Sequence, residues 1–180
     1  MTISLDDIAV LTADLVGIDS TNPDLVPGGA GEADIAAFVA GWLREAGLDV
    51  TEHDLGQGRA NVVGVLPGSG GGKSLMLNAH MDVVGAGGMA DPWAPRREGN
   101  RLYGRGSYDM KASLAVIMLV AREAASWSLG GDLLVTAVAD EEFASIGTQD
   151  IVRNYRADAA IVTEPTGLEL CVAHKGFVWI

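Results

Sequence analysis

Residues 74–82, SLMLNAHMD, decide the fold of this chain. The stretch begins with the apolar run of a buried strand and turns polar at its carboxyl end, where His80 and Asp82 stand. In an open α/β sheet, ligands bind beyond the carboxyl ends of the strands. The stretch therefore predicts a central strand and, directly after it, side chains placed for chemistry.

Helical and strand-like patterns alternate on both sides of this stretch. Apolar residues recur with helical spacing in residues 5–17, 32–46, 112–127 and 146–155. Strands are expected at residues 49–53, 61–66, 101–103, 132–139, 159–163, 168–173 and 177–180. Glycines and two prolines in the segment 85–100 predict irregular structure there. This order indicates an α/β sandwich with a mixed, mostly parallel sheet.

The composition is that of an acidic globular protein. Of its 180 residues, 48% are apolar, and 24 acidic against 12 basic residues give a net charge of −12. This charge argues against nucleic acid or an anionic membrane surface as a partner. Cys171 is the only cysteine, the N-terminus lacks a basic signal-peptide region, and no apolar run is long enough to span a membrane. We expect a cytoplasmic protein with no membrane segment.

Four polar clusters follow strand-like runs. They are NAHMD (78–82), GRGSYDMK (104–111), DEE (140–142) and TEPT (163–166). If the strands before them run parallel, the clusters meet at one edge of the sheet. That edge would then hold His80, Asp82, Asp109, Glu141, Glu142 and Glu164.

These six side chains suit a divalent metal. Five carboxylates brought together repel one another and resist ionisation, and a bound dication removes that cost. One imidazole with several carboxylates favours zinc, manganese or cobalt, and it differs from the thiolate set of a structural zinc site. A shared carboxylate could bridge two metals about 3.5–4 Å apart.

Each cluster alone has a simpler interpretation. A single histidine at a strand end is most often a surface or capping residue, and Asp82 could belong to a turn. Asp109 could cap the helix expected at 112–127. The run 140–142 could be a solvated charged surface, and Glu164 an ordinary loop residue. It is the combination of four clusters in one small domain that predicts a metal site.

The same segments resemble a known family. NAHMDVV (78–84), GRGSYDMK (104–111), ADEE (139–142), TEPT (163–166) and HKGFVWI (174–180) are similar, in order and spacing, to the motifs of the co-catalytic zinc aminoacylase and carboxypeptidase family. The resemblance implies a three-layer sandwich like the catalytic domain of zinc exopeptidases. It also implies two zinc ions, with cobalt or manganese as substitutes, and a homodimeric parent protein.

The resemblance assigns metal-binding roles residue by residue. His80 matches the histidine ligand of one zinc, and Asp82 matches the carboxylate that orients this histidine. Asp109 matches the bridging carboxylate, and the resemblance implies a cis peptide bond after it. Glu142 matches a ligand of the other zinc, and Glu164 matches the remaining carboxylate ligand on the His80 side.

The implied reaction is hydrolysis of an amide bond in an N-acyl amino acid or a small peptide. Glu141 matches the general base, which takes a proton from a metal-activated water and passes it to the leaving amine. The motifs favour a deacylase resembling acetylornithine deacetylase or succinyl-diaminopimelate desuccinylase. The alternatives are a carboxypeptidase or dipeptidase of the same family, a non-catalytic metal-binding module, and an unrelated α/β protein with solvated acidic loops.

The chain departs from the family in its length. Family members are much longer and complete their second zinc site with a further histidine, whereas of His53, His80 and His174 only His80 stands in a ligand motif. We therefore expect residues 1–175 to be the N-terminal part of the metal-binding domain and residues 176–180 to begin a missing lid and dimerisation domain. Such a chain would bind one metal and have little activity by itself.

Overall fold

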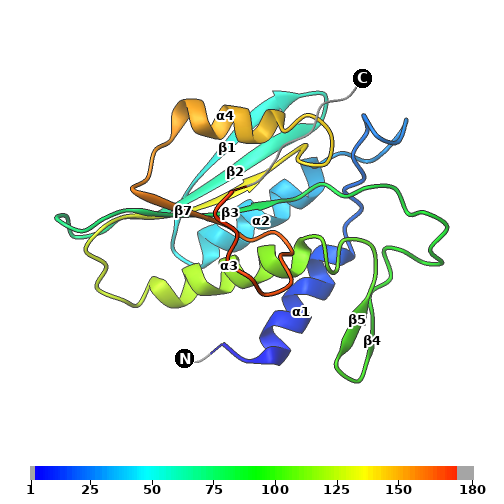
Figure 1. Ribbon diagram of the computed structural model, residues 1–180, viewed down its shortest axis with the longest axis horizontal. Coiled ribbons are helices and arrows are strands. Elements are labelled where there is room, and N and C mark those ends of the chain that lie inside the picture. Colours follow the sequence, from blue (N-terminus) through cyan, green and yellow to red (C-terminus); the bar gives the residue numbers. More distant parts are fainter. Residues whose placement is uncertain (1–2, 174–180) are drawn as a thin grey trace.

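The computed structural model describes residues 3–173 (Figure 1). Its helices are α1 (Leu5–Val16), α2 (Ala33–Glu45), α3 (Lys111–Ala124) and α4 (Ile146–Asn154). Its strands are β1 (Asp49–Gly56), β2 (Arg59–Leu66), β3 (Leu75–His80), β4 (Arg96–Glu98), β5 (Arg101–Tyr103), β6 (Leu133–Val138) and β7 (Ala159–Val162). None of the helices in this described part is long and apolar enough to cross a membrane.

Five strands form one mixed sheet in the order β1-β2-β6-β3-β7. The pairs β1–β2 and β2–β6 are antiparallel, whereas β6–β3 and β3–β7 are parallel. Helices α1, α2 and α3 cover one face of the sheet and α4 covers the other, which makes three layers (Figure 1). The predicted mixed α/β sandwich is confirmed, with its parallel part confined to β6, β3 and β7.

Apolar burial explains the layers. All six residues of β6 are buried, because helices cover both faces of this strand. The larger core cluster joins β2, β3 and β6 to side chains of the three helices below, among them Leu15, Ile35 and Leu114. A smaller cluster packs Ile151 of α4 against the opposite face of the same strands. The two clusters fix the sheet between its helices and so fix where its strands end.

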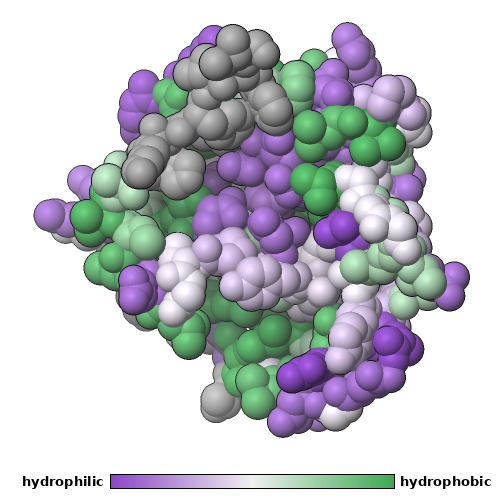
Figure 2. Space-filling view, turned by 45° about the vertical axis from the view of Figure 1, so that its right-hand side comes forward, coloured by the Kyte–Doolittle hydropathy of each residue, from purple (hydrophilic) through white to green (hydrophobic). Residues whose placement is uncertain are grey.

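The parallel strands bring three of the four polar clusters to one edge. His80 lies opposite Val138, which stands two residues before Asp140. Asn78 lies opposite Val162, which stands two residues before Glu164. Figure 2 shows the molecule turned so that the right-hand side of Figure 1 comes forward. Hydrophilic side chains gather near the centre of the face seen there, between hydrophobic areas.

The strand expected at 101–103 exists but does not join the main sheet. It is β5, which pairs with β4 in a separate two-stranded sheet. The prediction of irregular structure at 85–100 is therefore wrong for 96–98. The turn between the two strands includes Gly99 with a φ of 58°, a conformation that favours glycine. The cluster 104–111 thus follows a hairpin rather than a strand of the main sheet.

The strand expected at 168–173 is absent. Its three large apolar side chains, Leu168, Leu170 and Val172, are each 92% exposed or more. An apolar pattern becomes a strand only where neighbours pack against it, and no partner strand lies there within residues 3–173. His174, the strand expected at 177–180 and the domain boundary predicted at residue 176 lie outside the described residues.

Candidate metal centre

His80, the last residue of β3, has a fully buried side chain. Its Nδ1 lies 2.8 Å from the backbone carbonyl oxygen of Asp82. A carbonyl can only accept, so Nδ1–H is the donor and Nε2 is the nitrogen turned to the sheet edge. Nε2 lies 3.1 Å from Asp109 Oδ1 and 3.7 Å from Glu164 Oε1. The imidazole is thus oriented as a metal-ligating histidine is, with one nitrogen held by the protein.

The residues predicted from the sequence form two overlapping groups around this nitrogen. Ligand atoms of His80, Asp109 and Glu142 lie within 4.8 Å of one another, and so do those of His80, Glu141 and Glu164. Each group combines one imidazole with two carboxylates, a donor set that suits zinc and similar divalent cations. The structure therefore brings together every metal ligand that the sequence predicts.

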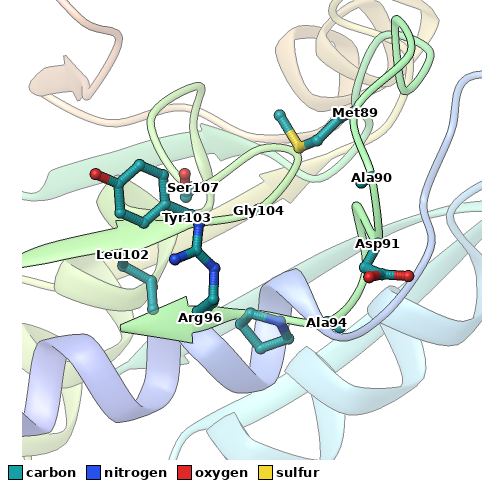
Figure 3. A pocket seen from close by; sticks show the side chains of 10 residues that line it. Met89, Ala90, Asp91, Ala94, Arg96, Leu102, Tyr103, Gly104 and Ser107 are labelled. Atoms are coloured by element: carbon teal, nitrogen blue, oxygen red, sulfur yellow. The ribbon is translucent and has the colours of Figure 1, made fainter. Parts of the chain in front are cut away.

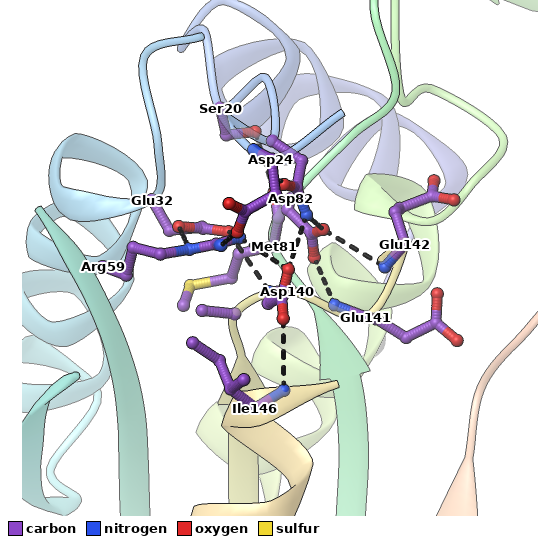
Figure 4. Close-up of polar contacts among 12 residues, drawn as sticks. Ser20, Asp24, Glu32, Arg59, Met81, Asp82, Asp140, Glu141, Glu142 and Ile146 are labelled. Atoms are coloured by element: carbon purple, nitrogen blue, oxygen red, sulfur yellow. Dashed lines mark hydrogen bonds and ion pairs between the residues drawn. The ribbon is translucent and has the colours of Figure 1, made fainter. Parts of the chain in front are cut away.

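Asp82 lies beneath these groups and holds their backbone. Its Oδ1 accepts the Glu141 N–H at 2.9 Å, and its Oδ2 accepts the Glu142 N–H at 3.2 Å (Figure 4). Oδ2 also accepts from Asn22 Nδ2 at 2.7 Å. The carboxylate is 3.5 Å from His80 Nδ1, so the shorter contact to the imidazole comes from the backbone carbonyl of Asp82. The expected role of the Asp82 carboxylate in orienting His80 stays a prediction, while its hydrogen bonds hold the backbone of both glutamates.

A buried ionic network lies behind Asp82 (Figure 4). Arg59 Nη2 lies 2.7 Å from Glu32 Oε1 and 3.0 Å from Asp140 Oδ1. Asn22 Nδ2 donates to Asp140 as well as to Asp82. The sequence analysis missed Arg59, Glu32 and Asn22, and its solvated interpretation of Asp140 is wrong, because this side chain is buried.

The electrostatics of the centre favour a bound cation. Burial, together with neighbouring carboxylates, raises the pKa of Glu142 and of Glu164 to about 7. The hydrogen bond with His80 lowers the pKa of Asp109. Burial alone would lower the pKa of His80, but contacts with Asp109 and Asp82 outweigh it and raise that pKa. Without a cation the cluster retains protons, and a divalent ion would replace them.

Asp109 reaches the centre from the loop before α3. The N-cap position of α3 belongs to Met110, and no side chain caps the helix, so the capping interpretation of Asp109 is wrong. The cis peptide bond expected between Asp109 and Met110 is present.

Lys111 is fully buried, and its Nζ donates to the Ile18 carbonyl at 2.7 Å. Burial lowers the pKa of Lys111 to about 7. The hydrogen bond from Lys111 to Ile18 ties the Asp109 loop to the segment that follows α1.

The segment that contains these side chains matches the model of a known family. The model of peptidase family M20/M25/M40 matches residues 76–175, which is more than half of the chain. The chain belongs to this family. The resemblance found in the motifs is therefore confirmed, and the matched segment contains the predicted ligands His80, Asp109, Glu142 and Glu164.

Two curated relatives illustrate the M20-family similarity. The chain is 34% identical over 145 residues to N-formyl-4-amino-5-aminomethyl-2-methylpyrimidine deformylase of Bacillus subtilis, covering 76% of this chain and 34% of that protein. It is 32% identical over 152 residues to acetylornithine deacetylase of Salmonella typhimurium, covering 81% of this chain and 39% of that protein. The alignments thus span less than half the length of either relative.

Solved structures share the fold. Human carnosine dipeptidase 1 matches with a TM-score of 0.75 at 19% identity, covering 89% of this chain and 39% of that one. A tripeptidase from Staphylococcus aureus matches with a TM-score of 0.73 at 22% identity, covering 92% of this chain and 45% of that one. These likenesses support the three-layer, exopeptidase-like architecture of this M20-family chain.

A cavity of about 700 Å³ lies between the loop around Met89 and the β4–β5 hairpin (Figure 3). Arg96 and Tyr103 of the hairpin line one side, and Asp91 lines another. Ser107, two residues before Asp109, also lines it. The cavity therefore adjoins the loop that brings Asp109 to the candidate metal centre.

Proposed function

We propose that this chain forms the metal-binding part of a zinc-dependent amide hydrolase that acts on small N-acylated amines, N-acyl amino acids among them. The observation that carries the proposal is the orientation of His80. Its Nε2 faces Asp109 and Glu164 at 3.1 and 3.7 Å, while its Nδ1 is occupied by a backbone carbonyl. A histidine with a solely structural role would not need a ring nitrogen surrounded by carboxylates.

The metal would be held by the side chains predicted from the sequence. His80, Asp109 and Glu164 would hold the ion that this chain is expected to bind. Asp109 and Glu142, which form a group with His80, are the side chains that a second ion would use. Zinc, when bound, supplies a Lewis acid that lowers the pKa of water and polarises an amide carbonyl. Asp82 keeps the imidazole and both loop glutamates in place, through its carbonyl oxygen and its carboxylate.

Glu141 is the residue assigned to proton transfer. Its carboxylate would take a proton from the attacking water and deliver it to the nitrogen of the leaving amine. Its backbone N–H is fixed by Asp82 at 2.9 Å, so the position of its Cα relative to His80 is set by the buried network. A base that is already held in position needs no reorganisation during the reaction.

The relatives favour a deacylase over a dipeptidase. The names of the two curated relatives described above, at 34% and 32% identity, describe removal of a formyl or an acetyl group. The structures named as peptidases are below 25% identity and inform only the fold. The cavity between the 86–95 loop and the β4–β5 hairpin, with Arg96 and Asp91 in its wall, is the proposed space for the rest of the substrate.

The first experiment measures zinc per chain after zinc loading and exhaustive dialysis. We expect the unaltered chain to retain zinc and His80→Ala to lose it. His53→Ala is the matched control, because His53 contacts Asp150 and Tyr155 and belongs to neither ligand group. Equal zinc content in the unaltered chain and His80→Ala would refute the metal centre as assigned.

Hydrolysis is tested with N-formyl and N-acetyl amines against a panel of dipeptides. Glu141→Gln should abolish turnover while zinc content stays near that of the unaltered chain. Turnover of dipeptides alone would replace the deacylase proposal with the dipeptidase alternative. Zinc binding with no turnover of either class is expected both of a chain with little activity by itself and of the non-catalytic metal-binding module, so only detected turnover decides between them.

A further inference from the structure

The loop that carries Glu141 and Glu142 is closed at its base. Gly147, in the first turn of α4, donates its N–H to the Ala139 carbonyl at 3.2 Å, so both ends of residues 139–147 meet. A Cβ at Gly147 would lie 2.4 Å from the Ala139 oxygen. The backbone segments at Ala139 and Gly147 therefore lie so close together that only glycine fits at position 147.

One side chain bridges this closure. Asn61, on β2, is fully buried, and its Oδ1 accepts the Ala139 N–H at 3.0 Å. Its Nδ2 donates to the Gly147 carbonyl at 2.9 Å and to Asp150 Oδ2 at 3.1 Å. The side-chain amide thus contacts Ala139 at the start of the loop, Gly147 in the first turn of α4, and Asp150 further along α4. Both ends of its side chain are used, so the contacts depend on an amide at this position.

The loop between these ends has a backbone conformation that needs support. Asp140 has a φ of 63° and Ser145 a φ of 54°, a region that side chains other than glycine rarely adopt. Ser145 N–H donates to the Asp140 carbonyl at 2.6 Å, which closes the loop between these two residues. Unfavourable dihedrals persist only where surrounding contacts enforce them. Asn61 supplies such contacts at both ends.

We propose that Asn61 is a positioning residue for the metal centre, because it holds closed the loop that presents Glu141 and Glu142. The inference rests on the proposed function, since it assigns the loop a role in metal binding. Asn61 lies on β2, whereas His80 ends β3 and the other predicted ligands lie in loops. Its side-chain amide accepts from the Ala139 N–H and donates to the Gly147 carbonyl, so it contacts the backbone at both ends of the loop.

The test compares Asn61→Ala with Leu43→Ala. Leu43 is a fully buried residue of α2, so its truncation destabilises the core on the face away from α4 and leaves the loop contacts in place. Both variants are studied at a temperature where circular dichroism shows them folded. Asn61→Asp, which keeps the acceptor for Ala139 but loses the donor to Gly147, serves if Asn61→Ala does not fold.

The first readout is zinc affinity by competition with a chromophoric chelator. We expect Asn61→Ala to bind zinc about 10- to 100-fold more weakly, as for other residues that orient ligands. Leu43→Ala should bind zinc like the unaltered chain. Unchanged affinity in folded Asn61→Ala would overturn the proposal.

The second readout is amide hydrogen exchange at Glu141 and Glu142 in the metal-free chain. These amides donate to Asp82 and should exchange faster in Asn61→Ala than in Leu43→Ala. This measurement separates the two proposals. An unaltered chain that binds no zinc would refute the proposed metal centre, while unchanged exchange in Asn61→Ala would refute the role of Asn61 whatever the metal result.

Discussion

The Asp82 carboxylate accepts the backbone N–H of Glu141 at 2.9 Å, although the two residues are 59 positions apart in sequence. The same carboxylate accepts from Glu142 N–H and from Asn22 Nδ2, so all three of these partners are donors. Asp82 also receives the His80 Nδ1–H on its carbonyl oxygen. One residue therefore fixes the ligand on β3 relative to the glutamates that follow β6.

Replacing Asp82 by asparagine should weaken metal binding without removing a ligand. An amide oxygen can accept from one side, but its NH₂ group would face a donor on the other. We expect Asp82→Asn to bind zinc about 10- to 100-fold more weakly. Zinc competition with a chromophoric chelator measures this, with Asp34→Asn on the exposed first turn of α2 as the control. Identical affinity in the two variants would mean that Asp82 does not orient the centre.

The metal-free chain should lose stability as the pH rises from about 5 to 6.5. Burial and nearby carboxylates raise the pKa of Glu142 and of Glu164 from 4.5 to about 7. Within this window the folded chain holds protons that the unfolded chain has released, so by linkage raising the pH favours unfolding. Lys111 opposes this only weakly, because its pKa of about 7 leaves most of its side chain protonated in the folded as well as in the unfolded chain within this window.

Zinc should reverse this pH dependence. Ligands bind the metal in their deprotonated forms, so the zinc-loaded chain should gain stability over the same window. Thermal unfolding with and without zinc measures both slopes. Glu169→Gln, a change at an exposed glutamate outside both ligand groups, should leave both slopes unaltered. Metal-free stability that stayed flat or rose with pH would contradict the assignment of Glu142 and Glu164 to one crowded cluster.

Much of the sheet follows from local sequence, whereas the candidate ligands follow from the four polar clusters taken together. β6 is a continuous apolar run, and β3 is an apolar run that ends in polar residues, so each pattern has one natural interpretation. Their parallel pairing then places His80 and Glu141 at the same edge. Each cluster directly follows its strand or hairpin, which predicts that the clusters meet, and the resemblance to the family then assigns the candidate ligands.

The buried network was not predictable, because nothing local marks its members as buried. Glu32 and Arg59 look like surface charges, and each becomes buried only through a partner 27 positions away. Asp140 stands beside two further acidic residues, a pattern typical of a solvated surface. Asn61 is one polar residue in an apolar strand, and only its contacts with Ala139 and Gly147 explain it.

Removing Arg59 should strongly destabilise the chain. Its guanidinium lies 2.7 Å from Glu32, with side chains 4% and 0% exposed, and 3.0 Å from the buried Asp140. Arg59→Ala would leave these carboxylates buried without a cation, at a cost of about 3–5 kcal/mol. Arg44→Ala is a matched control, because Arg44 also lies 2.7 Å from a glutamate, Glu52, but with side chains 51% and 41% exposed.

Urea unfolding curves separate these two arginines. The exposed pair should contribute about 0–1 kcal/mol, so Arg44→Ala should unfold near the midpoint of the unaltered chain. Similar small losses in both variants would mean that the Arg59 network is not compact in solution.

Two glycine-to-alanine changes should have opposite effects on stability. At Gly147 a new Cβ would lie 2.4 Å from the Ala139 oxygen, 2.5 Å from Asn61 Oδ1 and 2.6 Å from the Ala139 nitrogen. Two of these atoms belong to backbone, so Gly147→Ala must open the base of the 139–147 loop, and we expect a lower melting temperature and weaker zinc binding.

Gly41 lies inside α2 with nothing within 4 Å of its Cβ position, so Gly41→Ala should stabilise the chain by about 0.5–1 kcal/mol. Differential scanning calorimetry and zinc competition on both variants test this. Normal zinc affinity in a folded Gly147→Ala would show that the loop can present Glu142 without a closed base.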